Sequence, residues 1–276
     1  MKLRRTIAVL ITCHNRKLKT LQCLKNLYAQ QGINLLFKLD IYLVDDNSTD
    51  GTFNEINLIY PNVNLIKGNG NLYWNRGMHL AWKTAVATKE YDYYLWLNDD
   101  TFLYENAIND LLLKQSKNEI ICGTTRSAIS DFATYGGYNN PNKKILFPNG
   151  KFQSVDYCNG NFVLIPNAVF KIVGNLDPFF HHAIGDFDYT LRAKKFGVKL
   201  YVAPNFIGTC ESHSSEPRWR STSEKLTNRL RLLYAPTSGC HPFQYFVFDK
   251  RHNGFFLASL HFMSIHLRAV IPKLWK

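Results

Sequence analysis

Residues 93–101 read Y-Y-L-W-L-N-D-D-T, and this stretch decides the fold. The apolar run from 93 to 97 is typical of a strand that is buried on both faces, as in a parallel sheet. The run stops at Asn98, Asp99 and Asp100. Because ligands bind at the carboxyl ends of strands in open α/β sheets, this polar cluster lies where a site is expected.

Asp99 and Asp100 are adjacent carboxylates that repel each other. Burying them unpaired would cost several kcal/mol, so a cation is their natural partner. Oxygen ligands suit a hard cation such as Mg²⁺ or Mn²⁺. The alternative is an ordinary polar loop after a core strand, and these residues alone support the two interpretations equally.

Strand-like and helix-like patterns alternate along the chain. Predicted strands lie at residues 6–11, 39–44, 63–66, 93–97, 120–123, 158–165 and 198–202. Predicted helices lie at residues 17–30, 52–60, 76–89, 167–173 and 185–196. The alternation predicts an α/β fold with a mostly parallel, doubly wound central sheet flanked by helices. Residues 126–157, rich in Gly, Asn, Pro and Tyr, predict a binding surface of loops and short strands.

The charge of the chain is concentrated at its C-terminal end. The 276 residues carry a formal net charge of +12, and from residue 217 onward ten Lys or Arg stand against two Asp or Glu. Such an excess suggests a polyanionic partner, either nucleic acid or an anionic membrane surface, and the alternative is plain solubility. The six cysteines lack the spacing of a zinc site or a disulfide frame, which favours a reducing compartment. No apolar run has the length of a signal peptide or a membrane span.

Residues 254–276 combine apolar and basic side chains. On a helix they form a broad apolar surface, which His261, His266 and Arg268 interrupt, and Pro272 would end the helix. A helix lying in a membrane interface fits these features. The alternative is a helix packed back on the catalytic domain or in a homo-oligomer interface. Nucleic acid is the poorer interpretation, because apolar residues outnumber charges here.

Two loops carry side chains that could contact a ligand. Residues 45–52 follow a predicted strand, and a carboxylate there can accept a hydrogen bond from a uracil or thymine ring or from a ribose hydroxyl; the alternative is an Asx turn. Residues 68–77 read G-N-G-N-L-Y-W-N-R-G. Glycine lets a backbone approach a ligand closely, Tyr73 and Trp74 can stack, and Arg76 can pair with a phosphate. A flexible connector is the alternative.

Asp186 and Asp188 begin a predicted helix. One of them can act as a general base while the other orients or pairs, and Arg192 is a salt-bridge partner for Asp188 at i+4. The alternative is an N-terminal helix cap. His213 follows the last predicted strand and is of interest only with a metal.

Four segments occur in a telling order: I-A-V-L-I-T-C-H-N at 7–15, V-D-D-N-S-T-D-G-T at 44–52, N-D-D at 98–100 and G-D-F-D-Y-T-L-R at 185–192. Together they resemble a family-2 glycosyltransferase with a GT-A nucleotide-sugar-binding fold, over about residues 5–215. Residues 68–77 resemble a loop of bacterial rhamnosyltransferase-like members. The resemblance implies a UDP- or dTDP-sugar donor, a divalent metal (Mg²⁺ or Mn²⁺) and mostly inverting chemistry.

The resemblance also implies residue roles. Asp186 would be the catalytic base, Asp100 would ligate the metal, and His213 matches a second metal ligand of members that act on lipid-linked acceptors. The donor-binding positions would be Thr12, Asn15, Asp46, Asn75, Arg76, Asp99 and Asp188. Two departures stand out, because Asn98 replaces the first carboxylate of the family's Asp-x-Asp and Gly185 replaces the first acid before the catalytic helix.

These observations predict a catalytic domain at 1–215, with a nucleotide-binding half (1–118) and an acceptor half (119–215), and a basic helical region at 216–276. The expected activity is metal-dependent transfer of a hexosyl or deoxyhexosyl group to a glycan or lipid-linked acceptor in cell-surface polysaccharide biosynthesis. We expect a cytoplasmic protein in peripheral contact with the inner face of the membrane. The alternative is a non-catalytic carbohydrate- or nucleic-acid-binding protein on the same fold.

Overall fold

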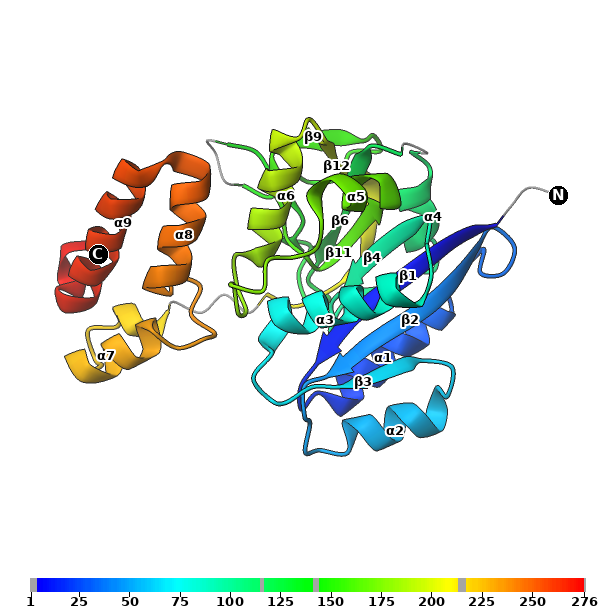
Figure 1. The fold of residues 1–276 in the computed structure, drawn as a ribbon, viewed down its shortest axis with the longest axis horizontal. Helices are drawn as coiled ribbons and strands as arrows, with labels where there is room; N and C mark the ends of the chain where they lie inside the picture. The colour runs from blue at the N-terminus through cyan, green and yellow to red at the C-terminus, as the bar shows by residue number, and fades with distance from the viewer. Residues whose placement is uncertain (1–3, 115–116, 141–143, 213–216, 276) are drawn as a thin grey trace.

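The computed structural model describes residues 4–114, 117–140, 144–212 and 217–275. Within these ranges the centre is a ten-stranded sheet (Figure 1). Its main path runs in the order β3 (Asn64–Lys67), β2 (Phe37–Asp45), β1 (Arg5–Cys13), β4 (Tyr93–Leu97), β11 (Phe162–Pro166), β6 (Glu119–Arg126), β12 (Lys199–Thr209) and β5 (Phe102–Leu103). Off this path, β7 (Ala133–Tyr135) pairs with β6 and β9 (Gln153–Val155) pairs with β12. A separate ladder joins β8 (Gly137–Tyr138) and β10 (Tyr157–Cys158).

The sheet is mostly parallel, as predicted. Strands β3, β2, β1 and β4 run parallel, and so do β6 and β12. The alternation in the sequence did not show that β11 is antiparallel to both β4 and β6. The chain returns from β6 to β11 through short strands and loops, without the crossover helix that a parallel return requires.

Helices cover both faces of the sheet (Figure 1). One face packs against α3 (Tyr73–Thr88), α5 (Asn167–Val173) and α6 (Gly185–Lys195), and the other packs against α1 (Lys17–Tyr28), α2 (Thr52–Ile59) and α4 (Ala107–Leu112). Strand β4 has the predicted bounds and is buried on both sides: Tyr94 and Trp96 enter the first core, and Leu95 and Leu97 enter the second. Its polar end therefore projects from the middle of a rigid sheet.

The C-terminal region forms a small helical layer beside α6 (Figure 1). It comprises η1 (Arg218–Arg220), α7 (Leu226–Leu233), α8 (Pro242–Asn253), α9 (Phe255–Val270) and η2 (Pro272–Trp275). Trp219, Leu233, Ile265 and Ala269 form its core. The helix predicted from residue 254 ends at Val270, and Pro272 starts a separate turn. In the described ranges no helix combines the length and apolarity that crossing a bilayer demands.

Helix α8 is tied to α6 by charged groups. The Arg251 guanidinium contacts Asp188 Oδ1 at 2.7 Å and Asp177 Oδ2 at 2.8 Å. The ring of His252 lies 3.0 Å from the same Asp188 oxygen, and Arg192 Nε lies 2.8 Å from the other. Since Asp188 is fully buried, these partners are needed to offset its desolvation. The tail therefore packs on the protein through α8.

Candidate functional site

A cavity of about 390 Å³ opens at the carboxyl ends of β1, β2 and β4. It brings together Thr12, Asp46 and Asp99, three side chains that the sequence predicts as donor contacts. The other lining residues are Cys13, His14, Arg16, Gly70, Tyr73, Trp74, His182 and Thr237. Motifs that are far apart in the chain thus meet at one edge of the sheet, as expected for an α/β fold.

The Asp46 carboxylate organises the glycine-rich loop. Its Oδ1 accepts a hydrogen bond from the Gly70 amide at 2.7 Å, and its Oδ2 accepts from the amides of Leu72 and Tyr73 at 2.8 and 3.0 Å. A carboxylate offers about four acceptor positions, so about one remains for a ligand. Asp46 therefore fixes the cavity wall and still faces its interior.

Arg16 lies between the two carboxylates at the end of β4. Its Nη1 is 3.2 Å from Asp99 Oδ1 and 2.8 Å from Asp100 Oδ2. Both acids are buried, and burial raises the pKa of Asp99 to about 7, against the opposing effect of the Arg16 charge. The sequence predicts a cation beside this pair, and in the structure the guanidinium of Arg16 is such a cation. Arg16 directly follows the motif that ends at Asn15, yet its role was not predicted.

The carboxylates of Asp99 and Asp100 also fit a divalent metal. Mg²⁺ is commonly held by one or two protein carboxylates together with substrate phosphates and water. Among the described residues no group of three His, Cys, Asp or Glu side chains is placed to hold a metal ion, so a substrate and water would supply further ligands. His213, the predicted second ligand, lies outside the described residues.

Asn98 anchors an aromatic wall of the cavity. Its Oδ1 accepts a hydrogen bond from Trp74 Nε1 at 2.6 Å. The indole ring lies over Gly160, where an added Cβ would come within 2.4 Å of the ring. The amide that replaces the family's first carboxylate therefore holds Trp74 in place, and only glycine at position 160 leaves room for it.

Asp186 lies in the first turn of α6, on the other side of Gly160. Its Oδ2 accepts a hydrogen bond from the Gly160 amide and its Oδ1 from the Phe187 amide, both at 2.9 Å. Desolvation raises the pKa of Asp186 to about 6, although these two hydrogen bonds oppose the shift. Ile184, the residue before α6, has a φ of 74°, a strained conformation for a β-branched side chain and one that clusters at functional sites. A carboxylate that two backbone hydrogen bonds hold in place and whose pKa is raised has the properties that a general base needs.

Close packing explains why residue 185 is a glycine. A Cβ at this position would lie 1.8 Å from Asn75 Oδ1, so no side chain fits there. Asn75 is fully buried, and its Nδ2 donates to the carbonyls of Asp177 and Phe180 at 2.8 Å each. Asn75, predicted as a donor contact, instead fastens α3 to the segment before α6.

Three more predicted donor residues contact the protein rather than line the cavity. Asn15 Oδ1 accepts from the Thr49 amide at 2.7 Å, and Arg76 Nε donates to the Pro178 carbonyl at 2.8 Å. Asp188 is buried in the ion pairs that hold α8. Conversely, His182 and Thr237 line the cavity although they were not predicted. Each is a single residue on a loop far away in the chain, and no local sequence pattern identifies such a residue.

Comparison with solved structures shows the same fold in glycosyltransferases. The mannosyltransferase PcManGT from Pyrobaculum calidifontis, in complex with GDP-Man and Mn²⁺, superposes with a TM-score of 0.57 at 12% identity, over 99% of this chain and 88% of that chain. S. aureus TarS 1–349 gives 0.56 at 12% identity, over 96% and 81%. GalNAc-T7 with UDP, GalNAc and Mn²⁺ gives 0.56 at 14% identity, over 94% and 57%.

At these identities the likeness shows the fold alone, and it confirms the predicted GT-A architecture. Comparison with curated protein sequences gives no match. The model of Glycosyl transferase family 2 matches residues 8–172, which is more than half of the chain and spans the ends of β1, β2 and β4. The chain therefore belongs to glycosyl transferase family 2.

Proposed function

We propose that the protein moves a hexosyl or deoxyhexosyl group, with inversion, from a UDP- or dTDP-sugar to a hydroxyl of a glycan or lipid-linked acceptor in cell-surface polysaccharide biosynthesis. The observation that carries the proposal is the desolvated Asp186 carboxylate, separated by Gly160 from the Trp74 wall of the strand-end cavity. Similar structures contain GDP-Man, UDP-GlcNAc, or UDP with GalNAc, which supports a nucleotide-sugar donor.

Within this proposal the cavity holds the nucleotide sugar. Thr12 and Asp46 would contact the base and ribose, Asp99 would face the ribose side, and the rings of Tyr73 and Trp74 would offer stacking surfaces. The other four predicted donor residues would act indirectly, because their side chains hold the segments around the cavity in place. They are Asn15, Asn75, Arg76 and Asp188.

Asp100, with Asp99 beside it, would hold Mg²⁺ or Mn²⁺, and Mn²⁺ is present in two of the similar structures. When bound, such a cation offsets the negative charge that develops on the leaving diphosphate. His213 stays a proposed second ligand. The Arg16 guanidinium offsets one of the two negative charges of this pair, so we expect it to compete with a metal for these carboxylates.

Asp186 would act as the general base. The acceptor oxygen forms its bond to the anomeric carbon from the face opposite the diphosphate, the bond from that carbon to the diphosphate oxygen breaks, and the acceptor proton passes to the Asp186 carboxylate. A pKa of about 6 leaves the carboxylate ionised at pH 7 while keeping it basic enough to accept a proton.

The test compares Asp186→Asn with Asp131→Asn, a control at an acid whose side chain is 97% exposed. Nucleotide release from a panel of UDP- and dTDP-sugars is measured with Mn²⁺ and with chelator, and the product anomer is assigned by NMR. We expect Asp186→Asn to bind the donor normally and to lose at least about a hundredfold in transfer. Near-normal transfer by this variant, or a retained anomeric configuration, would contradict the mechanism.

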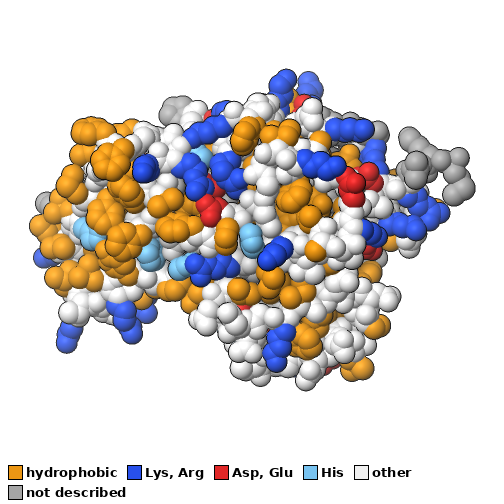
Figure 2. All heavy atoms as spheres, viewed as in Figure 1, with side chains coloured by type: hydrophobic (Ala, Val, Ile, Leu, Met, Phe, Trp, Pro, Cys, Tyr) orange, Lys and Arg blue, Asp and Glu red, His pale blue; other side chains and the backbone are white. Residues whose placement is uncertain are grey.

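We further propose that the outer face of α9 lies on the anionic inner surface of the cell membrane. This face is the exposed apolar set Phe255, Phe256, Leu257, Leu260, Met263, Leu267, Val270 and Ile271. Figure 2 shows a broad hydrophobic area over this region, with Lys and Arg at its edges. Residues 250–276 contain no Asp or Glu, so an anionic lipid surface is the complementary partner.

A further inference from the structure

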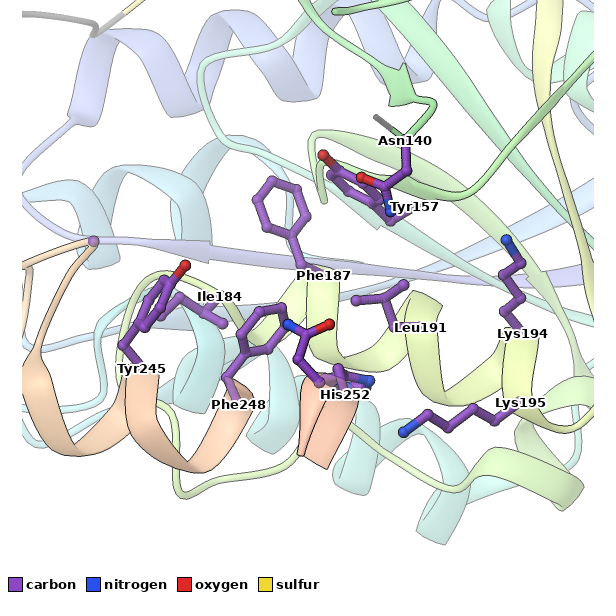
Figure 3. Close-up of a pocket in the computed structure, with 12 residues that line it drawn as sticks. Asn140, Tyr157, Ile184, Phe187, Leu191, Lys194, Lys195, Tyr245, Phe248 and His252 are labelled. Atoms are coloured by element: carbon purple, nitrogen blue, oxygen red, sulfur yellow. The ribbon is translucent and has the colours of Figure 1, made fainter. Parts of the chain in front are cut away.

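A second cavity, of about 810 Å³, separates α6 from α8 and shares no lining residue with the donor cavity. Its size is that of a typical small-molecule site. Figure 3 shows side chains from both helices pointing into the space between them. The lining residues are Asn140, Tyr157, Ile184, Phe187, Leu191, Lys194, Lys195, Gly239, Tyr245, Phe248, His252 and Asn253.

One end of the cavity is formed by sequence neighbours of the proposed base, and Asp186 itself is not a lining residue. Ile184 and Phe187 flank Asp186 in sequence and lie at one end, whereas Lys194 and Lys195 belong to the last turn of α6 and lie at the other (Figure 3). At a helical rise of 1.5 Å per residue, about 12 Å separate Phe187 from Lys195 along the axis. A molecule that fills the cavity therefore extends from the neighbourhood of the base toward two ammonium groups.

The walls of the cavity are aromatic. The rings of Tyr157 and Phe187 lie 5.0 Å apart on the catalytic side, and those of Tyr245 and Phe248 lie 6.0 Å apart on α8. A sugar ring presents C–H groups on its faces and hydroxyls at its edge. Aromatic side chains can cover such a face through hydrophobic contact, and the side chains of Asn140 and Asn253 provide polar groups nearby.

The far end of the cavity is positively charged. None of its lining residues is acidic. Lys194 pairs with Asp156, which offsets one of the two charges, and Lys195 Nζ donates to the backbone carbonyl of Arg251. One net positive charge thus remains at this end, and an anionic group is its natural ligand.

We propose that this cavity is the acceptor site and that it binds a glycan whose rings lie against the aromatic walls while an anionic group of the glycan reaches Lys194 and Lys195. The assignment rests on the proposed function, because it requires Asp186 to be the base. The anionic group is a phosphate, as in a lipid-linked acceptor, or a carboxylate, as in an acidic polysaccharide.

The test uses three probes: glucose, glucuronic acid and glucose 1-phosphate. Binding is followed by ligand-observed NMR with UDP and Mn²⁺ present, so that the donor cavity is occupied. We expect a charged probe to bind about fivefold more tightly than glucose, the size of one exposed charge pair. The preferred anion shows whether the acceptor carries a phosphate or a carboxylate. The preference should vanish in Lys194→Gln/Lys195→Gln and persist in Lys171→Gln, a surface control.

A blocking variant locates the site. A Cβ at Gly239 would meet open space, and this residue lines the cavity, so Gly239→Trp should fill the cavity and abolish the binding of all three probes while the melting temperature stays unchanged. Equal binding of neutral and charged probes, or normal probe binding by Gly239→Trp, would overturn the acceptor assignment. A failure of the protein to bind UDP, measured separately by calorimetry, would instead contradict the proposed function.

Discussion

Asp186 is the residue whose environment determines how the proposed reaction depends on pH. Desolvation raises the pKa of this carboxylate to about 6, and a general base works only in its ionised form. We therefore expect kcat/KM to rise tenfold per pH unit below about 6 and to level off above it. The measurement is transfer rate against pH from about 4.5 to 8 with saturating metal. A profile that is flat through pH 6 would move the base to another group.

Arg16 competes with a metal for the same pair of carboxylates. In Arg16→Gln the contacts of 3.2 and 2.8 Å to Asp99 and Asp100 are lost, which removes one positive charge from beside two adjacent carboxyl groups. We expect Mn²⁺ to bind this variant on the order of tenfold more tightly without donor, equivalent to about 1.4 kcal/mol. Calorimetric titration with Mn²⁺ measures this directly.

The control is Arg126→Gln, which removes a guanidinium that pairs with the exposed Asp131. Its Mn²⁺ affinity should equal that of the wild type. If Arg16→Gln binds Mn²⁺ no better than the wild type, the guanidinium and the cation occupy different positions around Asp99 and Asp100.

Side chains at strand ends were the predictable part of the site. Thr12, Asp46 and Asp99 follow apolar runs, so their place at one edge of the sheet follows from topology. The ion pair of Asp188 with Arg192 was predicted from the i+4 spacing and is present, whereas the contacts of Asp188 with α8 and those of Asn75 were not predictable, because these partners come from distant parts of the chain. A sequence shows that a carboxylate is present, whereas tertiary packing decides which partner it has.

At the scale of elements, the junction between α3 and α6 depends on close packing. Gly185→Ala would place a Cβ 1.8 Å from Asn75 Oδ1, and overpacking of this kind typically costs about 1–3 kcal/mol. For a chain of this size we expect the melting temperature to fall by about 3–10 °C. Calorimetry should also show that Asn75→Ala/Gly185→Ala loses less than the sum of the single variants.

Gly239→Ala serves as the control for Gly185→Ala, because its new methyl group meets open space. It should melt within about a degree of the wild type. Additive losses in the double variant would show that the two residues do not share the same space.

Substitutions on the outer face of α9 test the membrane proposal. Phe256 and Met263 are 73% and 59% exposed, so Phe256→Glu/Met263→Glu should leave the fold intact. We expect the wild type to sediment with phosphatidylglycerol vesicles at low salt and the variant to stay in solution, because the added charges oppose both apolar insertion and lipid attraction.

Ile129→Glu, at a residue that is 91% exposed on a distant loop, is the control and should sediment like the wild type. Equal sedimentation of the double variant would contradict the proposal. If the wild type forms a dimer without vesicles and the double variant is a monomer, the face binds a second copy of the chain instead.

Elements marked by a continuous apolar run or by a clear helical period were predicted well. Strand β4 has its predicted bounds, and α6 ends one residue before the predicted end. The sequence did not reveal β5 or α4, which have two and six residues and are too short to display a period. The orientation of β11 was also missed, because hydrophobic patterning does not encode strand direction.

At the scale of the whole molecule, the two cavities lie on either side of the same structural joint. His182 lines the donor cavity and Ile184 lines the acceptor cavity, on the segment that leads into α6. On the loop that leads into α8, Thr237 lines the donor cavity and Gly239 lines the acceptor cavity. The segments that lead into α6 and α8 therefore border both cavities, and the C-terminal region contributes to each of them.

The ion pairs between Asp188 and α8 have a consequence for local unfolding. Detaching α8 would leave a fully buried carboxylate without Arg251 and His252, so α8 should not open alone. We expect native-state hydrogen exchange, followed by mass spectrometry, to show α6 and α8 exchanging their amides as one cooperative unit. In Arg251→Leu, α8 should exchange earlier than α6. The resistance of α6 to local unfolding would then depend on a contact between two residues that are 63 positions apart in the chain.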